Sequence, residues 1–325
     1  MARGIGTAPA RERAGGSRDL LGRVPPPLLL GFGIVSVQVG AGLAARMFGS
    51  VPAAGLTGLR LWWATVLLIG LAGRPAFRAM RALVAGRAWR DGIVLLAFGV
   101  TLGIMNFSIY QSFARIPLGI AVTIEFLGPL AVAIASSRKP IDLVWVALAA
   151  TGVTLLGTHG VSVAKVGGAA ATGGTGTEVA GVLFALAAAA SWACYIMLSA
   201  ATGRRFGGSS GLVIAMAVGS LVVTPPAVLS AGRALLRPAV LAAGLAIGLL
   251  SSVIPYRFEL ETLRRVPPRV FGIWMSLEPA GAALVGVVML SQSLTVPQWL
   301  AIGCVIVASA GAALGAGRGS TAPQA

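Results

Sequence analysis

The sequence predicts an all-α polytopic membrane protein with ten transmembrane helices. Of its 325 residues, 57% are hydrophobic and 10% are charged, and the mean hydropathy is +0.89. Soluble domains carry roughly 25% charged residues, so this composition argues against a soluble fold. Apolar runs long enough to cross a bilayer, which takes about 20 residues, recur along the chain with Gly and Pro at most of their junctions.

Ten apolar segments have the length of a spanning helix. They cover residues 27–46, 53–73, 92–113, 117–137, 141–159, 179–200, 211–231, 239–260, 269–290 and 297–315. Between and beyond them, we expect a disordered basic lead over residues 1–25, a flexible outer loop rich in Gly, Thr and Ala over residues 160–178, and a short tail over residues 316–325.

The positive charges predict the orientation. With the N-terminus inside, 18 of the 25 Lys and Arg residues fall in cytoplasmic segments and 5 fall outside, so the positive-inside rule places both termini in the cytoplasm. The net charge of +16 does not indicate a nucleic-acid partner, because the charges lie at the ends of apolar runs.

A sequence repeat predicts that the ten helices form two related halves. Three residue pairs share a spacing of 150 positions: Arg115 and Arg265, Pro117 and Pro267, Pro129 and Pro279. The copies would be five-helix repeats over 26–159 and 179–315. Five spans is an odd number, so the second copy must be inverted. Inverted repeats are typical of secondary transporters, whose site lies at the repeat interface near the bilayer midplane.

Each repeat places one glutamate deep in the membrane. Glu125 lies about 12 Å along a helix from Pro117, and Glu278 lies about 16 Å from Pro267. A carboxylate at this depth costs about 2.5–3.5 kcal/mol and usually faces a functional cavity. Because the two helices enter from opposite faces, we expect the carboxylates to converge. The alternative is that each is a packing residue hydrogen-bonded to a neighbouring helix.

Prolines follow both glutamates. Pro129 cannot donate a hydrogen bond to the carbonyl of Glu125, and Pro279 cannot donate to that of Met275. Each proline therefore predicts either a helix break that exposes a carbonyl to a solute or ion or a simple kink.

Further polar residues lie within the spans. Arg60 would bind a substrate carboxylate, pair with a glutamate, or snorkel to the outer surface. The pocket candidates among the uncharged residues are Gln38, Asn106, Tyr110, Tyr195 and Tyr256. We interpret the serines, including Ser251 and Ser252, as structural.

Charged residues also gather near the inner end of the segment 239–260. Glu259 and Glu261 lie close in sequence to Arg257, Arg264 and Arg265. This spacing predicts ion pairs at the membrane interface.

Nothing in the sequence indicates an enzyme. The chain has a single histidine and lacks a CxxC motif, a Ser/His/Asp set and a phosphate-binding glycine loop beside a lysine. We therefore expect no cofactor and no metal.

Several motifs resemble the EamA-type family of the drug/metabolite transporter superfamily. They are Pro117-Leu-Gly-Ile-Ala-Val-Thr-Ile-Glu125-Phe-Leu-Gly-Pro129, Ser136-Ser-Arg-Lys-Pro-Ile-Asp-Leu-Val-Trp145, Ser191-Trp-Ala-Cys-Tyr195 and Met275-Ser-Leu-Glu278-Pro-Ala. The resemblance covers residues 27–315. The sequence departs from the pattern at Arg257 and Phe258 and at the loop Ser291-Gln-Ser.

The family resemblance implies export of small metabolites, typically amino acids, driven by the proton gradient across the bacterial inner membrane. We expect a substrate of the threonine and homoserine type, whose ammonium group pairs with Glu125 or Glu278 and whose carboxylate meets Arg60 or helix amides. Protonation of a carboxylate would release it. The alternatives are export of other metabolites or drugs, and a non-transporting membrane scaffold. The oligomeric state is left open.

Overall fold

The computed structural model describes residues 22, 24–72, 89–135, 140–158, 175–203 and 210–316. Within these ranges every regular element is a helix. Most of the predicted lead over 1–25, most of the predicted outer loop over 160–178 and most of the tail over 316–325 lie outside the described residues.

The described helices follow the predicted spans closely. They are α2 (Pro26–Met47), α3 (Ala53–Ala72), α5 (Trp89–Phe113), α6 (Leu118–Glu125), α7 (Leu127–Ala135), α8 (Asp142–Thr158), α9 (Thr175–Gly203), α10 (Ser210–Ala231), the 3-10 helix η1 (Gly232–Leu236), α11 (Pro238–Gly248), the π-helix η2 (Leu249–Val253), α12 (Ile254–Leu263), α13 (Pro268–Met275), α14 (Glu278–Leu290) and α15 (Val296–Ala316).

Length and apolar composition make this a multi-pass membrane protein. Nine helical segments of the described chain are long and apolar enough to span a bilayer, and Asp142–Leu156 is a shorter apolar helix. One predicted boundary is wrong: α9 begins at Thr175, so the last residues of the predicted outer loop are helical. Its first turn contains Glu178, where a carboxylate interacts favourably with the helix dipole.

The fourth and ninth spans are each built from two half-helices. Between α6 and α7 the chain turns at Phe126, whose N–H still bonds to the carbonyl of Val122. Between α13 and α14 it turns at Ser276 and Leu277. Pro129 and Pro279 both lie in the first turn of the second half-helix, where a missing N–H has no intrahelical partner to lose.

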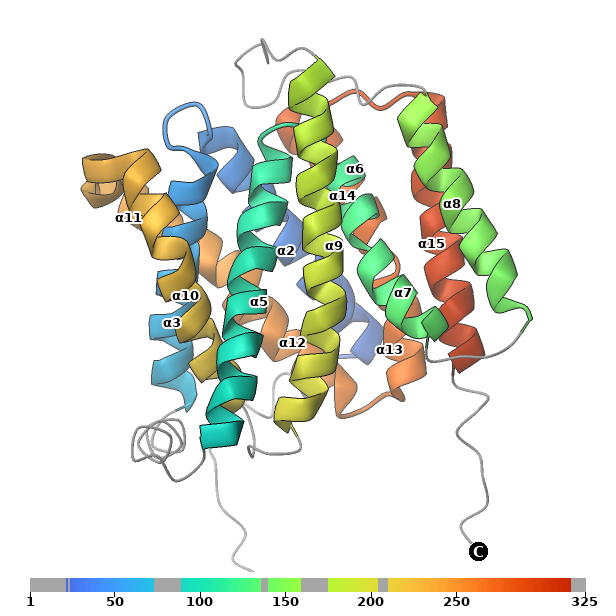
Figure 1. Cartoon of the computed structure of the whole chain (residues 1–325), viewed down its shortest axis with the longest axis horizontal. Coiled ribbons are helices and arrows are strands. Elements are labelled where there is room, and N and C mark those ends of the chain that lie inside the picture. The colour runs from blue at the N-terminus through green and yellow to red at the C-terminus, as the bar shows by residue number, and fades with distance from the viewer. Residues whose placement is uncertain are drawn as a thin grey trace, which may run out of the picture.

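The helices pack as one bundle, in which segments distant in sequence lie side by side. The most extensive pairings are α5 with α9, α3 with α10, α8 with α15, α5 with α10, and α2 with α12. Near the middle, α6 packs against α14. Helix α2 begins and α15 ends at the same edge of the bundle, the lower edge in Figure 1.

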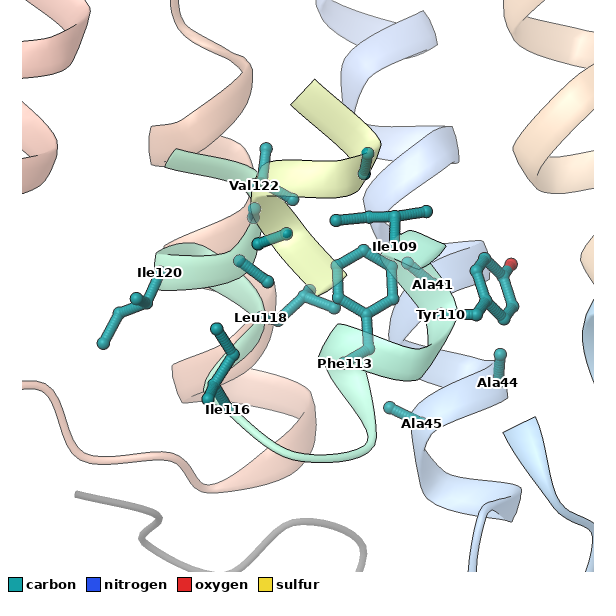
Figure 2. Packing of buried hydrophobic residues seen from close by; sticks show 14 of the residues in the cluster. Ala41, Ala44, Ala45, Ile109, Tyr110, Phe113, Ile116, Leu118, Ile120 and Val122 are labelled. Carbon is teal, nitrogen blue, oxygen red and sulfur yellow. The ribbon is translucent and has the colours of Figure 1, made fainter. Parts of the chain in front are cut away.

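The largest hydrophobic cluster fills the opposite edge, where α2 ends. Tyr110 and Phe113 of α5 lie among Ala41, Ala44 and Ala45 of α2 and the first turns of α6 (Figure 2). Every residue of α6 from Leu118 to Ile124 is buried. This end of the bundle is therefore closely packed.

Close contact between α7 and α9 depends on one glycine. A Cβ at Gly128 would stand 2.2 Å from the carbonyl oxygen of Ala189, so the helices must separate to admit any side chain. We expect Gly128→Val to destabilise the protein by about 1–3 kcal/mol or more, measured as a lower unfolding temperature in detergent. Gly31→Val is the control, because no atom lies within 4 Å of the Cβ position at Gly31. Equal unfolding temperatures would contradict the close contact.

Candidate functional site

Two adjoining cavities lie inside the bundle, with volumes of about 130 and 170 Å³. They share walls from α2, α3, α5, α9, η2 and α14. Every polar residue predicted for the site lines at least one of them. The first cavity has Gln38, Arg60, Asn106, Tyr110, Glu125 and Glu278, and the second has Arg60, Asn106, Tyr195, Tyr256 and Glu278.

Glu278 belongs to both cavities and is held by Gln38. It is the first residue of α14, and its Oε1 accepts a hydrogen bond of 3.2 Å from Nε2 of Gln38 on α2. The other carboxylate oxygen of Glu278 and the amide oxygen of Gln38 are buried and have no hydrogen-bond partner among the described residues. A buried oxygen without a donor is costly, which indicates that a hydrogen-bond donor from a ligand or water completes this site.

Arg60 supplies the positive charge of the cavities. Its guanidinium lies over the ring of Tyr110, with Cζ 5.0 Å from the ring centroid, and Nη2 donates a hydrogen bond of 3.5 Å to the carbonyl of Ser251. It also attracts Glu125, the last residue of α6. Arg60 therefore points into the protein, and the predicted alternative of snorkelling to the surface is wrong.

The carbonyl of Ser251, in the π-helix η2, is free to accept the hydrogen bond from Arg60. Pro255 lacks the N–H that would bond to the preceding turn, and π-helical turns leave backbone groups free at functional sites. The carbonyl of Leu250 accepts a hydrogen bond of 2.7 Å from Oγ of Ser36. Ser251 lines both cavities and Ser252 lines the second, so our interpretation of these serines as merely structural was incomplete.

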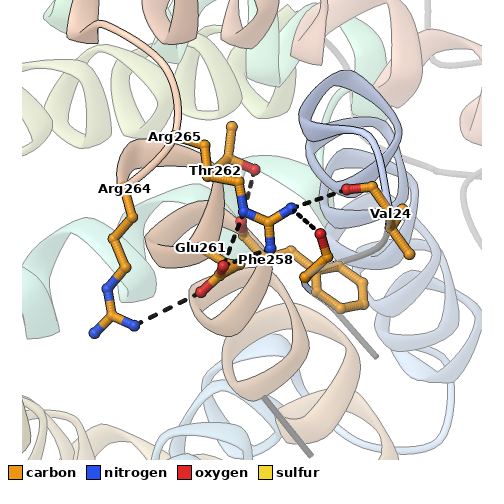
Figure 3. Close-up of polar contacts among 7 residues, drawn as sticks. Val24, Phe258, Glu261, Thr262, Arg264 and Arg265 are labelled. Carbon is orange, nitrogen blue, oxygen red and sulfur yellow. Dashed lines mark hydrogen bonds and ion pairs between the residues drawn. The ribbon is translucent and has the colours of Figure 1, made fainter. Parts of the chain in front are cut away.

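The two glutamates of α12 have different environments, and the prediction of interfacial ion pairs holds for one of them. Glu261 contacts Arg265, with Oε1 2.9 Å from Nε, and Arg264, with Oε2 3.6 Å from Nη1 (Figure 3). Glu259 instead lines the second cavity, so its predicted ion pair is wrong. Successive helical residues differ by about 100°, which places residue 259 on the face of Tyr256 and residue 261 on another face.

The sequence reasoning missed the apolar residues of the cavity walls, among them a tryptophan and a methionine. Trp192 of α9 and Met105 of α5 line both cavities. The ring of Trp192 also packs edge-on against Phe126, with centroids 5.2 Å apart, at the break between α6 and α7. Position 192 is one helical turn before Tyr195, so the shared face was the available signal.

The polar lining suits a small molecule that carries both charges. Among the described residues of the two cavities, Glu125, Glu259 and Glu278 are acidic and Arg60 is basic. Glu278 interacts electrostatically with both other carboxylates. Carboxylates and a guanidinium facing one enclosed space provide partners for an ammonium group and for a carboxylate.

Comparison with known proteins shows the family of this chain. Residues 179–314 match the EamA-like transporter family. The chain is 40% identical over 292 residues to the threonine/homoserine exporter RhtA of Escherichia coli strain K12, which covers 89% of this chain and 91% of that protein. It is also 40% identical over 293 residues to RhtA of Salmonella typhimurium strain LT2, with the same coverage. A solved crystal structure that is 20% identical aligns with a TM-score of 0.57 over 91% of this chain and 99% of its own, which shows the fold alone.

The family that matches is a transporter family and the relatives are exporters, so this chain is a membrane transporter and not an enzyme. The chain belongs to the EamA-like transporter family, with threonine/homoserine exporters among its relatives.

Proposed function

We propose that this protein exports small amino acids of the threonine and homoserine type from the cytoplasm across the bacterial inner membrane. The observation that carries the proposal is the cavity, which presents Glu125 and Glu278 together with Arg60. The identity with RhtA exporters supports the choice of substrate. In this proposal the substrate carboxylate binds Arg60, and its ammonium group binds Glu278 or Glu125.

The chemistry of this cavity supports the proposal of proton antiport. Each carboxylate can hold either a proton or the substrate ammonium group. A proton entering from outside would neutralise the carboxylate, weaken its attraction for the ammonium group and release the amino acid. The inward proton gradient would then drive export.

Two inverted repeats are supported by the helix bounds and by the packing. Helix α6 covers Leu118–Glu125 and α13 covers Pro268–Met275, a shift of 150 positions at both ends. If each helix is replaced by its counterpart in the other half, packed pairs should correspond to other packed pairs. The pair α5–α9 corresponds to α12–α2, α5–α10 to α11–α3, and α7–α9 to α14–α2, and all six pairs are packed. Arg115 bonds to Gln111 and Arg265 to Glu261, four residues earlier in each case.

Alternating access is supported by one difference between the halves. Helix α6 is buried from Leu118 to Ile124, whereas no residue of α13 is buried. Helix α6 packs against α14, but α13 has no comparable packing against α7. The cavities are therefore sealed at the edge where α2 ends and loosely covered at the edge where α2 begins. With the predicted orientation, this conformation receives substrate from the cytoplasm.

Hydrogen bonds join helix ends and a loop at the sealed edge. The N–H of Leu118, at the start of α6, donates to Oε1 of Gln292 at 3.1 Å. Gln292 lies in the loop that departs from the family pattern. Nearby, Nε of Arg46 donates to the carbonyl of Met289 at 2.8 Å, joining the end of α2 to the end of α14. These contacts would have to break for substrate to leave.

Transport of labelled amino acids tests the proposal. We expect inverted vesicles containing the protein to accumulate radiolabelled threonine and homoserine when the membrane is energised, and an uncoupler to abolish this accumulation. Vesicles without the protein are the control. If neither amino acid moves, the substrate assignment fails, and a wider panel of metabolites and drugs would then be examined. Movement that is insensitive to the uncoupler would contradict proton antiport.

A further inference from the structure

We propose that Glu259, together with Tyr256 and Ser252, forms a second binding site for the substrate ammonium group, on the cytoplasmic side of Glu278. This inference rests on the proposed export of amino acids and adds a binding step before the substrate reaches Glu125. Nothing in the sequence motifs that define the family resemblance assigns Glu259 to the site.

The position of Glu259 is the first observation. Glu125 lines the first cavity, Glu259 lines the second, and Glu278 lines both. Glu278 interacts electrostatically with each of the other two carboxylates. The three carboxylates thus form a row, with Glu259 nearest the loosely covered edge.

The partners of Glu259 are the second observation. Glu259 is half-buried and forms no ion pair with a cation of the described chain. Its neighbour Glu261 is neutralised by Arg264 and Arg265 outside the cavity. An ionised carboxylate in a membrane-embedded cavity is stabilised by a positive partner, and the ammonium group of an amino acid supplies one.

Hydrogen-bonding groups beside Glu259 are the third observation. Ser252 is 1% exposed, lines the same cavity, and its Oγ has no partner among the described residues. Tyr256, one turn before Glu259, lines the same cavity. A primary ammonium group has three N–H donors. Three oxygen groups of this cavity can accept hydrogen bonds from them: the carboxylate of Glu259, Oγ of Ser252 and Oη of Tyr256.

Substrate concentration dependence tests the second site. In inverted vesicles, where the cytoplasmic side faces the medium, we expect Glu259→Gln to raise the half-saturating threonine concentration about tenfold to a hundredfold, since one charge-assisted hydrogen bond is lost. The maximal rate and the sensitivity to uncoupler should change little. Glu259→Asp, which keeps the charge, should restore most of the affinity. Glu261→Gln is the matched control, two residues away on the same helix, and should leave the half-saturating concentration unchanged.

Direct binding gives a second readout. With purified protein in detergent, we expect unlabelled 1-amino-2-propanol, which has an amine but no carboxylate, to displace labelled threonine from wild type more effectively than from Glu259→Gln. N-acetylthreonine, which lacks the ammonium group, should displace it from neither. Equal half-saturation in wild type and Glu259→Gln would overturn the second site. Unchanged half-saturation with lost uncoupler sensitivity would also overturn it, assigning Glu259 to proton transfer. If wild type moves no threonine, the proposed function itself fails.

Discussion

Glu125→Gln is expected to abolish export while the protein still folds and inserts into the membrane. Glutamine has nearly the same shape as glutamate, so the packing of α6 should survive. The loss of its charge, however, is expected to have two effects. The charge balances Arg60 across the first cavity, and in the proposed antiport it exchanges a proton for the substrate ammonium group.

The expected loss is large. Removing one partner of a charged pair inside a protein costs about 3–5 kcal/mol, which corresponds to a loss of more than about a hundredfold in substrate affinity or transport. Uncoupler-sensitive export of labelled threonine measures it, with the amount of protein in the membrane determined in parallel. Glu261→Gln serves as the control, because Glu261 pairs with Arg265 outside the cavities. Full export by Glu125→Gln would exclude the proposed mechanism.

The second large effect is expected at Leu263, near the end of α12. The shift of 150 positions relates Leu260 and Leu263 to Tyr110 and Phe113. Tyr110 and Phe113 are 1% and 4% exposed and pack in the cluster at the edge where α2 ends, whereas Leu260 and Leu263 are 48% and 43% exposed. Leu263 lies one turn after Glu259 on the same helical face. We therefore expect Leu263 to become buried when the cytoplasmic edge closes.

Leu263→Asp should consequently be tolerated in the conformation described here but should block transport. Closing the cytoplasmic edge would bury an unpaired carboxylate, at a cost of several kcal/mol. We expect threonine binding by the purified protein to persist while export falls by about a hundredfold or more. Leu263→Met should export normally, and so should Leu236→Asp, which places the same charge at a residue that is 73% exposed in η1. Normal export by Leu263→Asp would show that this edge does not close around Leu263.

Most of the fold could be predicted from hydropathy and from the positions of prolines. The ten predicted segments agree with the described helices to within a few residues, because each segment must satisfy its own backbone hydrogen bonds in a bilayer whatever its neighbours are. The helix breaks follow from Pro129 and Pro279 for a similar local reason. The start of α9 at Thr175 differed from prediction because polar and small residues at a helix end carry little hydropathy signal.

The faces of the helices were harder to predict. In a soluble helix the apolar stripe marks the buried side, but a lipid-facing side is also apolar, so periodicity does not separate core from lipid. Glu259 and Glu261 illustrate this limit. Both are glutamates near the end of one span, yet one lines a cavity and the other pairs with Arg265.

The sequence by itself determined that this chain crosses a membrane many times, and it predicted that two halves are related by a spacing of 150 residues and that Glu125, Glu278 and Arg60 lie within the membrane. These properties depend on composition and on distance along a helix. Only the tertiary structure decided that Glu259 lines the cavity with Glu278, that Arg60 stacks on Tyr110, and that α6 is buried while α13 is not. Those features depend on which helices pack together, because a position along one helix does not determine which neighbouring helix its side chain meets.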